Sequence, residues 1–251
     1  MASKPSPKEA FAPARSIFPE TLGKGTSYTR LRGRRILIAN TSSGDPAHQP
    51  SSSPAATASS RAIATLFARE GAAVVCLDND REIADATVQQ IRREGGGAHP
   101  LVHDGAQSAE EIESTVEEAK KMLGGRLDGL VVCGEVAGSG FYKGLCKAAL
   151  GVMQLGGSIV VVSGVPGGAS SADALVRAVA CEGGGRGIRG NAIEMGGVDA
   201  SRESAPFGRL TTEWEIAYTA LFLMSHESTY ISGTTITLDG APQSRVEGSK
   251  L

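Results

Sequence analysis

The sequence predicts an α/β fold in which a parallel sheet lies between two layers of helices in a single domain. Short apolar runs, typical of buried strands, alternate along the chain with longer segments of helical character. The chain has 251 residues, of which 41% are hydrophobic, and this suits one domain with a substantial core. The cysteines show no CxxC spacing, so neither a metal site nor a disulfide framework is predicted.

The first half of the chain supplies the start of this alternation. Residues 35–40 carry the apolar run Ile-Leu-Ile-Ala and residues 73–77 carry Ala-Val-Val-Cys-Leu, so both are expected to be buried strands. Ser59 or Ser60 is expected to cap the first helix, which would run to residue 70. The next elements expected are a helix at 81–94, a short strand at 100–103 and a helix at 108–123.

The second half continues the same order. Strands are expected at 127–133, 158–163, 187–193 and 234–238, and helices at 145–155, 172–180 and 212–225. Continuous apolar strands separated by helices argue for a parallel sheet covered on both faces. We therefore expect a doubly wound, Rossmann-type fold with three αβα layers, in which ligands bind beyond the carboxyl ends of the strands.

Several segments carry a resemblance to a known family. The strand at 158–163 is followed by a helix-like run and then by Arg-Gly-Ile-Arg-Gly-Asn-Ala-Ile at 186–193, and residues 232–240 read Ser-Gly-Thr-Thr-Ile-Thr-Leu-Asp-Gly. In this order they resemble the short-chain dehydrogenase/reductase family, with the domain expected at 34–241. The resemblance implies oxidation or reduction of a small carbonyl, hydroxyl or enoyl substrate with NAD or NADP, in a homodimer or homotetramer.

The loop after the first strand resembles the family's cofactor loop. The run Asn40, Thr41, Ser42, Ser43, Gly44 follows the family's Thr-Gly-Ala-Ser-Ser-Gly, with Asn40 in place of the first glycine. Asparagine tolerates the left-handed backbone that glycine would supply. A Pro/Ser-rich insertion at 45–58 then delays the helix whose N-terminus would hold a pyrophosphate. The loop is interpreted as cofactor-binding, and the alternative is a vestigial loop.

The other expected cofactor contacts lie after later strands. Asp78 ends the second strand, where a carboxylate can accept hydrogen bonds from ribose hydroxyls and repel a 2′-phosphate, which favours NAD over NADP. The alternative for Asp78 is a solvated turn residue. By resemblance, Asp104 would lie near the adenine, Gly134 would allow close backbone approach, and Val198 would lie in the segment that contacts nicotinamide.

The residues that carry the family's reaction are missing. The family uses a serine after the strand at 158–163 and a Tyr-x-x-x-Lys pair on the next helix, but the serine position is Gly164 and neither partner is present there. Ser163 and Asp173 are the polar side chains left as catalytic candidates. An aspartate in the first turn of a helix, where we place Asp173, is more often a cap or dipole partner.

Three explanations fit these gaps. The chain could be an oxidoreductase with unusual chemistry, similar to peroxisomal 2,4-dienoyl-CoA reductases, which also lack the tyrosine but keep the lysine. It could be a family-derived pseudoenzyme that serves as a binding or oligomer partner, or as a cyclase or isomerase without hydride transfer. The sequence could also come from a misassembled gene model, because misplaced exon boundaries would produce such losses between intact segments.

The ends of the chain carry separate expectations. Residues 1–33 are expected to form a flexible arm, and residues 242–251 a polar tail that ends in Ser249-Lys250-Leu251, the address read by the peroxisomal import receptor. No apolar run is long enough for a membrane span and no secretory signal is seen. A net charge of −2 gives no electrostatic case for nucleic acid or an anionic membrane.

Overall fold

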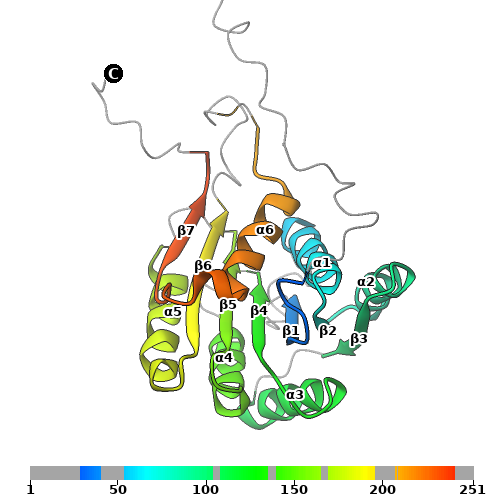
Figure 1. The fold of residues 1–251 in the computed structure, drawn as a ribbon, viewed down its shortest axis with the longest axis horizontal. Helices are drawn as coiled ribbons and strands as arrows, with labels where there is room; N and C mark the ends of the chain where they lie inside the picture. Colours follow the sequence, from blue (N-terminus) through cyan, green and yellow to red (C-terminus); the bar gives the residue numbers. More distant parts are fainter. Residues whose placement is uncertain are drawn as a thin grey trace, which may run out of the picture.

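A computed structural model describes residues 29–40, 54–103, 108–134, 140–164, 169–195, 207 and 209–240, and it contains a seven-stranded parallel sheet (Figure 1). The strand order is β3-β2-β1-β4-β5-β6-β7, and every neighbouring pair is parallel. The strands are β1 (Arg35–Asn40), β2 (Ala73–Asp78), β3 (Gly97–Val102), β4 (Gly129–Cys133), β5 (Ser158–Ser163), β6 (Arg189–Met195) and β7 (Thr235–Leu238). The predicted fold class is confirmed.

Helices cover both faces of this sheet, so the molecule has three layers. One apolar core lies under α1 (Pro54–Arg69), α2 (Arg81–Arg93) and α6 (Glu213–Met224). The second core lies under α3 (Ala109–Met122), α4 (Gly140–Val152) and α5 (Ala169–Gly183). Alternate side chains of the buried strands supply the two cores, as the pleat of a strand requires.

Three helices begin earlier than the sequence predicts: α1, α4 and α5, the last at Ala169 instead of residue 172. Helix α1 starts at Pro54 instead of residue 59, because proline has the backbone torsion of a first helical residue and lacks only an N–H that would have no helical partner. Residues 54–58 of the predicted insertion are therefore helical, while 45–53 lie outside the described residues. Helix α4 starts at Gly140 instead of residue 145, and its Tyr142 is fully buried, so packing outweighs the low helix propensity of its glycines.

The packed part of the chain also begins earlier than predicted. We placed residues up to 33 in a flexible arm, but the Leu31 side chain is fully buried in the core under α1. The Leu31 N–H donates to the Glu70 carbonyl at 3.1 Å, which ties this segment to the end of α1. Residues 1–28 and 241–251, which include the predicted import signal, lie outside the described residues.

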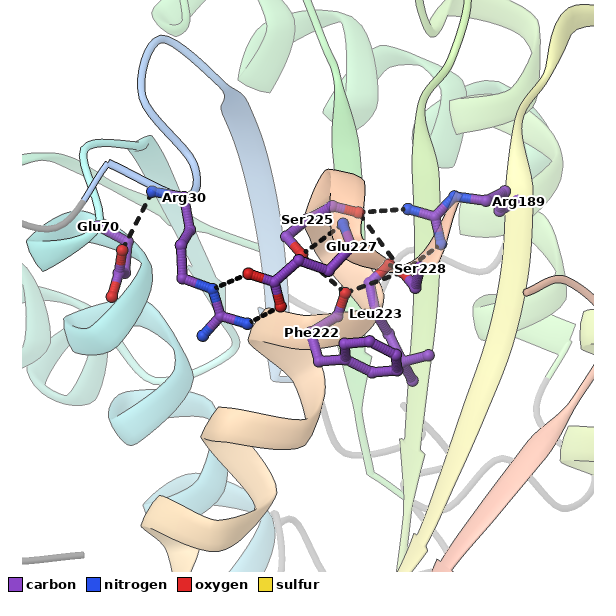
Figure 2. Close-up of polar contacts among 8 residues, drawn as sticks. All are labelled: Arg30, Glu70, Arg189, Phe222, Leu223, Ser225, Glu227 and Ser228. Atoms are coloured by element: carbon purple, nitrogen blue, oxygen red, sulfur yellow. Dashed lines mark hydrogen bonds and ion pairs between the residues drawn. The ribbon is translucent and has the colours of Figure 1, made fainter. Parts of the chain in front are cut away.

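A polar network holds the edge of the sheet where the strands begin (Figure 2). The Arg30 backbone N–H donates to Glu70 Oε2 at 3.2 Å, and the Arg30 guanidinium pairs with Glu227. Glu227 follows α6 in a short 3-10 helix (His226–Ser228). The Arg189 guanidinium, buried at the start of β6, donates to Ser228 Oγ at 2.8 Å and to the Ser225 carbonyl at 3.1 Å. The network therefore joins α1, α6 and β6.

The strand order also fixes where a ligand site can form. Strand β1 lies between β2 and β4, so the chain crosses to opposite sides of the sheet on either side of it. The crossovers diverge there, and folds of this kind bind their ligands at such a point, beyond the carboxyl ends of the strands. None of the helices in the described ranges is long and apolar enough to cross a bilayer.

Candidate functional site

The carboxyl ends of β1 and β2 bring a buried amide and a buried carboxylate together. Asn40 and Asp78 are paired in the parallel register, and their exposed fractions are 2% and 3%. Asn40 Nδ2 donates to Asp78 Oδ2 at 2.8 Å and to Thr57 Oγ1 of helix α1 at 3.3 Å. Two residues predicted from the sequence as cofactor contacts thus form one unit at the divergence of the crossovers.

Asp78 is positioned to accept further hydrogen bonds. Burial raises the pKa of its carboxyl group, and hydrogen bonds from the Asp80 backbone N–H and from Asn40 act in the opposite direction. The Asp80 N–H donates to Asp78 Oδ1 at 3.0 Å, and Asn40 Nδ2 donates to Oδ2, so both carboxylate oxygens are held by the protein. A carboxylate has about four lone-pair sites, so hydroxyl groups of a ligand could still be accepted. Burial argues against the alternative of a solvated turn residue.

Asn40 leaves one polar atom unsatisfied. Within the described part of the chain, its buried Oδ1 atom has no hydrogen-bond partner. An unmade hydrogen bond of this kind costs about 1–3 kcal/mol, and a donor brought to this edge would recover it. A ribose, which carries hydroxyl donors, fits a pair composed of this oxygen and the Asp78 carboxylate.

The end of β4 carries a glycine and a cysteine whose thiol is unreactive. Gly134 follows the strand with φ of 147°, where a side chain would be strained, and its N–H donates to the Val162 carbonyl at 3.1 Å. Burial raises the pKa of the neighbouring Cys133 thiol to about 12, so this cysteine stays protonated. The predicted role of Gly134 in close backbone approach is compatible with this geometry.

The ends of β5 and β6 place a serine beside a glutamate that the sequence reasoning missed. Ser163 is buried, and it is paired in register with Glu194. Both continue the strand alternation of Val161 and Ala192, which belong to the core under α5. Burial raises the pKa of the Glu194 carboxyl group, and the nearby carboxylate of Asp173 raises it further. The available signal was a lone carboxylate directly after the predicted strand at 187–193, followed by an apolar methionine.

Asp173 has structural partners instead of a free carboxylate. Its Oδ2 atom accepts from Arg177 Nε at 2.8 Å, and its Oδ1 atom accepts from Thr235 Oγ1 at 3.2 Å. The hydrogen bond from Arg177 lowers the pKa of Asp173, which keeps it ionised. From the sequence we expect Asp173 in the first turn of this helix. That placement is wrong, because α5 begins at Ala169 and Asp173 therefore lies in the second turn. It is thus unsuited to cap the helix.

The remaining predicted contacts are not placed. Ser42, Ser43, Gly44, Asp104 and Val198 lie outside the described residues, so their roles stay predictions. Across the described ranges, no group of three or more His, Cys, Asp or Glu side chains is arranged to hold a metal ion.

Comparison with known proteins gives matches over most of the chain. The family model described as short chain dehydrogenase matches residues 55–151, and the one described as enoyl-(acyl carrier protein) reductase matches residues 135–241. A 3-oxoacyl-[acyl-carrier-protein] reductase of Thermotoga maritima is 29% identical over 84% of this chain and 98% of its own length. A probable 2,4-dienoyl-CoA reductase of Bacillus subtilis is 40% identical, over 26% of this chain and 33% of its own.

Solved structures give the same answer for the fold. A hydroxysteroid dehydrogenase from Escherichia coli superposes with a TM-score of 0.68 at 25% identity, and the match covers 86% of this chain and 98% of that one. The strand order, the site at the ends of β1 and β2, and the two family models lead to one conclusion. The chain belongs to the short-chain dehydrogenase/reductase family.

Proposed function

We propose that this protein is an oxidoreductase that binds NAD(H) and acts on a small carbonyl, hydroxyl or enoyl group. The observation that carries this proposal is the buried pair of Asn40, with its unsatisfied oxygen, and Asp78, at the carboxyl ends of β1 and β2. The family to which the chain belongs uses NAD or NADP and binds a small substrate. The carboxylate of Asp78 supports NAD, because it would repel the 2′-phosphate of NADP.

The reaction requires a proton as well as a hydride. Bound nicotinamide would supply or accept the hydride. The chain would have to move the proton with its own side chains, and α5 carries neither the tyrosine nor the lysine used by the family. The strand register places two polar side chains that could do so, Ser163 and Glu194, side by side at the carboxyl ends of β5 and β6. A glutamate with a raised pKa is able to hold a proton near neutral pH better than an ordinary one.

The relatives support an acyl substrate. The 2,4-dienoyl-CoA reductase and the 3-oxoacyl-[acyl-carrier-protein] reductase both act on acyl thioesters by name. The C-terminal Ser249-Lys250-Leu251 supports delivery to peroxisomes by the import receptor. Together they make a fatty acyl thioester the substrate class to test first.

We also propose that the protein forms a homodimer or homotetramer, as is typical of its family. Strand β7 is the edge strand of the sheet and its side chains are half-buried or exposed. In helix α6, Trp214, Tyr218 and Phe222 recur at helical spacing and are only partly buried in the described chain. A second copy would cover such apolar surface.

A second candidate is a binding protein that has lost turnover. The absence of Tyr-x-x-x-Lys from residues 164–183 and the engagement of Asp173 by Arg177 favour it. Both candidates keep the nucleotide site, so nucleotide binding and turnover have to be measured separately. Sequencing the transcript would test a misassembled gene model, because recovery of the missing pair would overturn the catalytic argument from Ser163 and Glu194 and the binding-protein candidate.

Nucleotide binding is tested by thermal shift with NADH and NADPH. We expect NADH at 100 times its Kd to stabilise the protein by about 2.7 kcal/mol, which is a rise of several degrees in Tm, and NADPH to do less. Asp78→Asn should reduce the NADH shift and narrow the difference between the two nucleotides. Asp85→Asn, on the half-exposed surface of α2, is the matched control. No shift with either nucleotide would end the oxidoreductase proposal.

Turnover then separates the two candidates. Consumption of NADH is followed by absorbance after addition of 3-oxoacyl or 2-enoyl thioesters. Oxidation of NADH above the rate without protein identifies an enzyme. A protein that binds NADH but consumes none with these thioesters fits the binding-protein candidate.

A further inference from the structure

We propose that the edge of the sheet where the strands begin is a docking surface for an anionic membrane. Because all strands are parallel, their first residues and the turns that lead into them lie along one edge, opposite the nucleotide edge. We call this the basal edge. It is formed by Arg32, Arg34 and Arg35 at β1, Arg126 before β4, Leu155 before β5, and Arg186 before β6.

The basal edge is rich in positive charge, although the net charge of the whole chain is slightly negative. It carries five arginines, whereas the whole chain has a net charge of −2. Among the described residues at this edge, Asp128 is paired with Arg126 and Glu227 with Arg30, and Glu70 accepts from the Arg30 backbone N–H. The other four arginines, Arg32, Arg34, Arg35 and Arg186, form no ion pair with a described carboxylate. A net charge near zero is thus compatible with a local basic surface, and the expectation drawn from net charge alone does not apply to this edge.

Backbone carbonyl groups hold Arg34 and Arg35 in place without neutralising them, whereas Arg126 also pairs with the Asp128 carboxylate. A carbonyl oxygen accepts a hydrogen bond but carries no formal charge, so the guanidinium groups keep their attraction for anions. The acceptors are the carbonyl of Gly156 at 3.3 Å from Arg34 Nη1, that of Gly124 at 3.3 Å from Arg35 Nη1, and that of Gly33 at 2.7 Å from Arg126 Nη2. The Gly156 N–H also donates to the Arg186 carbonyl at 3.0 Å.

An apolar side chain protrudes among these arginines. Leu155 lies in the turn between α4 and β5 and is 78% exposed, although leucine is usually buried. Its neighbour Gly156 accepts a hydrogen bond from the Arg34 guanidinium and donates one to the Arg186 backbone carbonyl, so the leucine lies beside the Arg34 guanidinium. Met122, at the end of α3, is a second exposed apolar residue close to the Gly124 turn that binds Arg35.

This combination fits a lipid surface better than an acidic peptide. Arginines attract phosphate and carboxylate headgroups, and an apolar side chain enters the boundary between headgroups and acyl chains. A side chain at the tip of a turn projects outward, and a deformable bilayer can accept it without a matching pocket. An extended acidic peptide would instead need a groove to cover its own apolar groups. The proposal does not depend on nucleotide binding at the opposite edge.

The test is sedimentation of the full chain with vesicles. We expect binding to phosphatidylcholine vesicles that contain about one-third phosphatidylserine, and no binding to phosphatidylcholine alone. Binding should disappear near 1 M salt, where the Debye length is only about 3 Å. Arg32→Gln should weaken binding about fivefold, which corresponds to roughly 1 kcal/mol per basic residue. Leu155→Ser should weaken it about tenfold through the loss of apolar burial.

Matched variants at the opposite edge are the controls. Arg81→Gln removes an exposed arginine at the start of α2, and Phe207→Ser removes an apolar residue that is 55% exposed beside Gly240. Both should bind anionic vesicles as the parent does, and all four variants should keep its Tm. Failure to bind anionic vesicles, equal binding to neutral vesicles, or unchanged binding of Arg32→Gln and Leu155→Ser would overturn the proposal. A change in oligomeric mass of these two variants, with no vesicle binding by the parent, would assign the edge to contact between copies.

Discussion

At the scale of single residues, the site is marked by polar groups that a folding core would avoid. Asn40 holds an unsatisfied buried oxygen, Asp78 is a buried carboxylate, and Glu194 is a half-buried carboxylate in the last two residues of β6, whose other residues are buried. Each of these groups taken by itself lowers the stability of the fold, and all three lie at the carboxyl ends of parallel strands. Residues that break a local rule in this way are expected where a protein binds or reacts.

Glu194 makes this argument measurable. Folding raises the pKa of its carboxyl group above the ordinary value of 4.5, so the folded state binds that proton more tightly than the unfolded state. The resulting stability is fully present below pH 4.5 and is lost as pH rises through the folded pKa. We therefore expect Glu194→Gln to raise the free energy of unfolding at pH 7 relative to the parent, and to change it less at pH 4.

Chemical denaturation at the two pH values measures this difference. Glu182→Gln is the control, because Glu182 is exposed on the surface of α5 and should have no effect at either pH. A Glu194→Gln protein that is destabilised equally at both pH values would contradict the expectation, since it would show a structural role for the carboxylate.

At the scale of elements, α5 lies unusually close to β6. A Cβ atom added at Gly190 would lie 2.6 Å from Val179 Cγ1 and 2.9 Å from the Val176 carbonyl oxygen. Both distances are below van der Waals contact, and one partner is a branched side chain while the other is backbone. Glycine at this point of β6 is therefore what allows the helix to approach the strand.

Two alanine substitutions distinguish the effect of this close contact on stability from the general effect of replacing a glycine. Gly190→Ala should destabilise the protein by about 1–3 kcal/mol, because the helix or the strand has to shift. Gly151→Ala, on the exposed surface of α4 with open space around it, should instead stabilise it by about 0.5–1 kcal/mol, through the gain in helix propensity. Denaturant midpoints measure both. The same sign for the two variants would contradict the argument.

The elements themselves show what the sequence could predict. The apolar runs of β1, β4 and β5 identify buried strands directly, and the order of the elements predicts the parallel sheet. The start of α4 could not be read, because two glycines oppose helix formation and only the burial of Tyr142 offsets them. Among the site residues, Asp78 could be identified from the sequence because it ends an apolar strand. Glu194 could not, because only the register between β5 and β6 places it beside Ser163.

At the scale of the whole molecule, the network of Figure 2 joins parts of the chain that are far apart in sequence. Arg30 and Glu227 are separated by 197 positions, and Arg189 reaches the turn that follows α6. The two arginines differ in burial, however. The Arg189 side chain is enclosed, while Arg30 and Glu227 both remain accessible to solvent.

Removal of each arginine should therefore have a different cost. Arg189→Ala leaves the Ser225 carbonyl and the Ser228 hydroxyl without this donor in a buried place and removes packed side-chain surface, so we expect a loss of about 2–3 kcal/mol. Arg30→Ala removes a solvent-exposed ion pair and should cost less than about 1 kcal/mol. Thermal or chemical unfolding measures both, and equal losses would show that the exposed pair is energetically coupled to the buried one.

The parallel course of the strands has a consequence for orientation. β1 advances about 3.3 Å per residue over six residues, so its two ends stand roughly 20 Å apart. If arginines at one end rest on a lipid leaflet, the strands stand upright on it, and the mouth beside Asn40 opens toward water on the side away from the lipid. Attachment and nucleotide exchange would then proceed without obstructing one another.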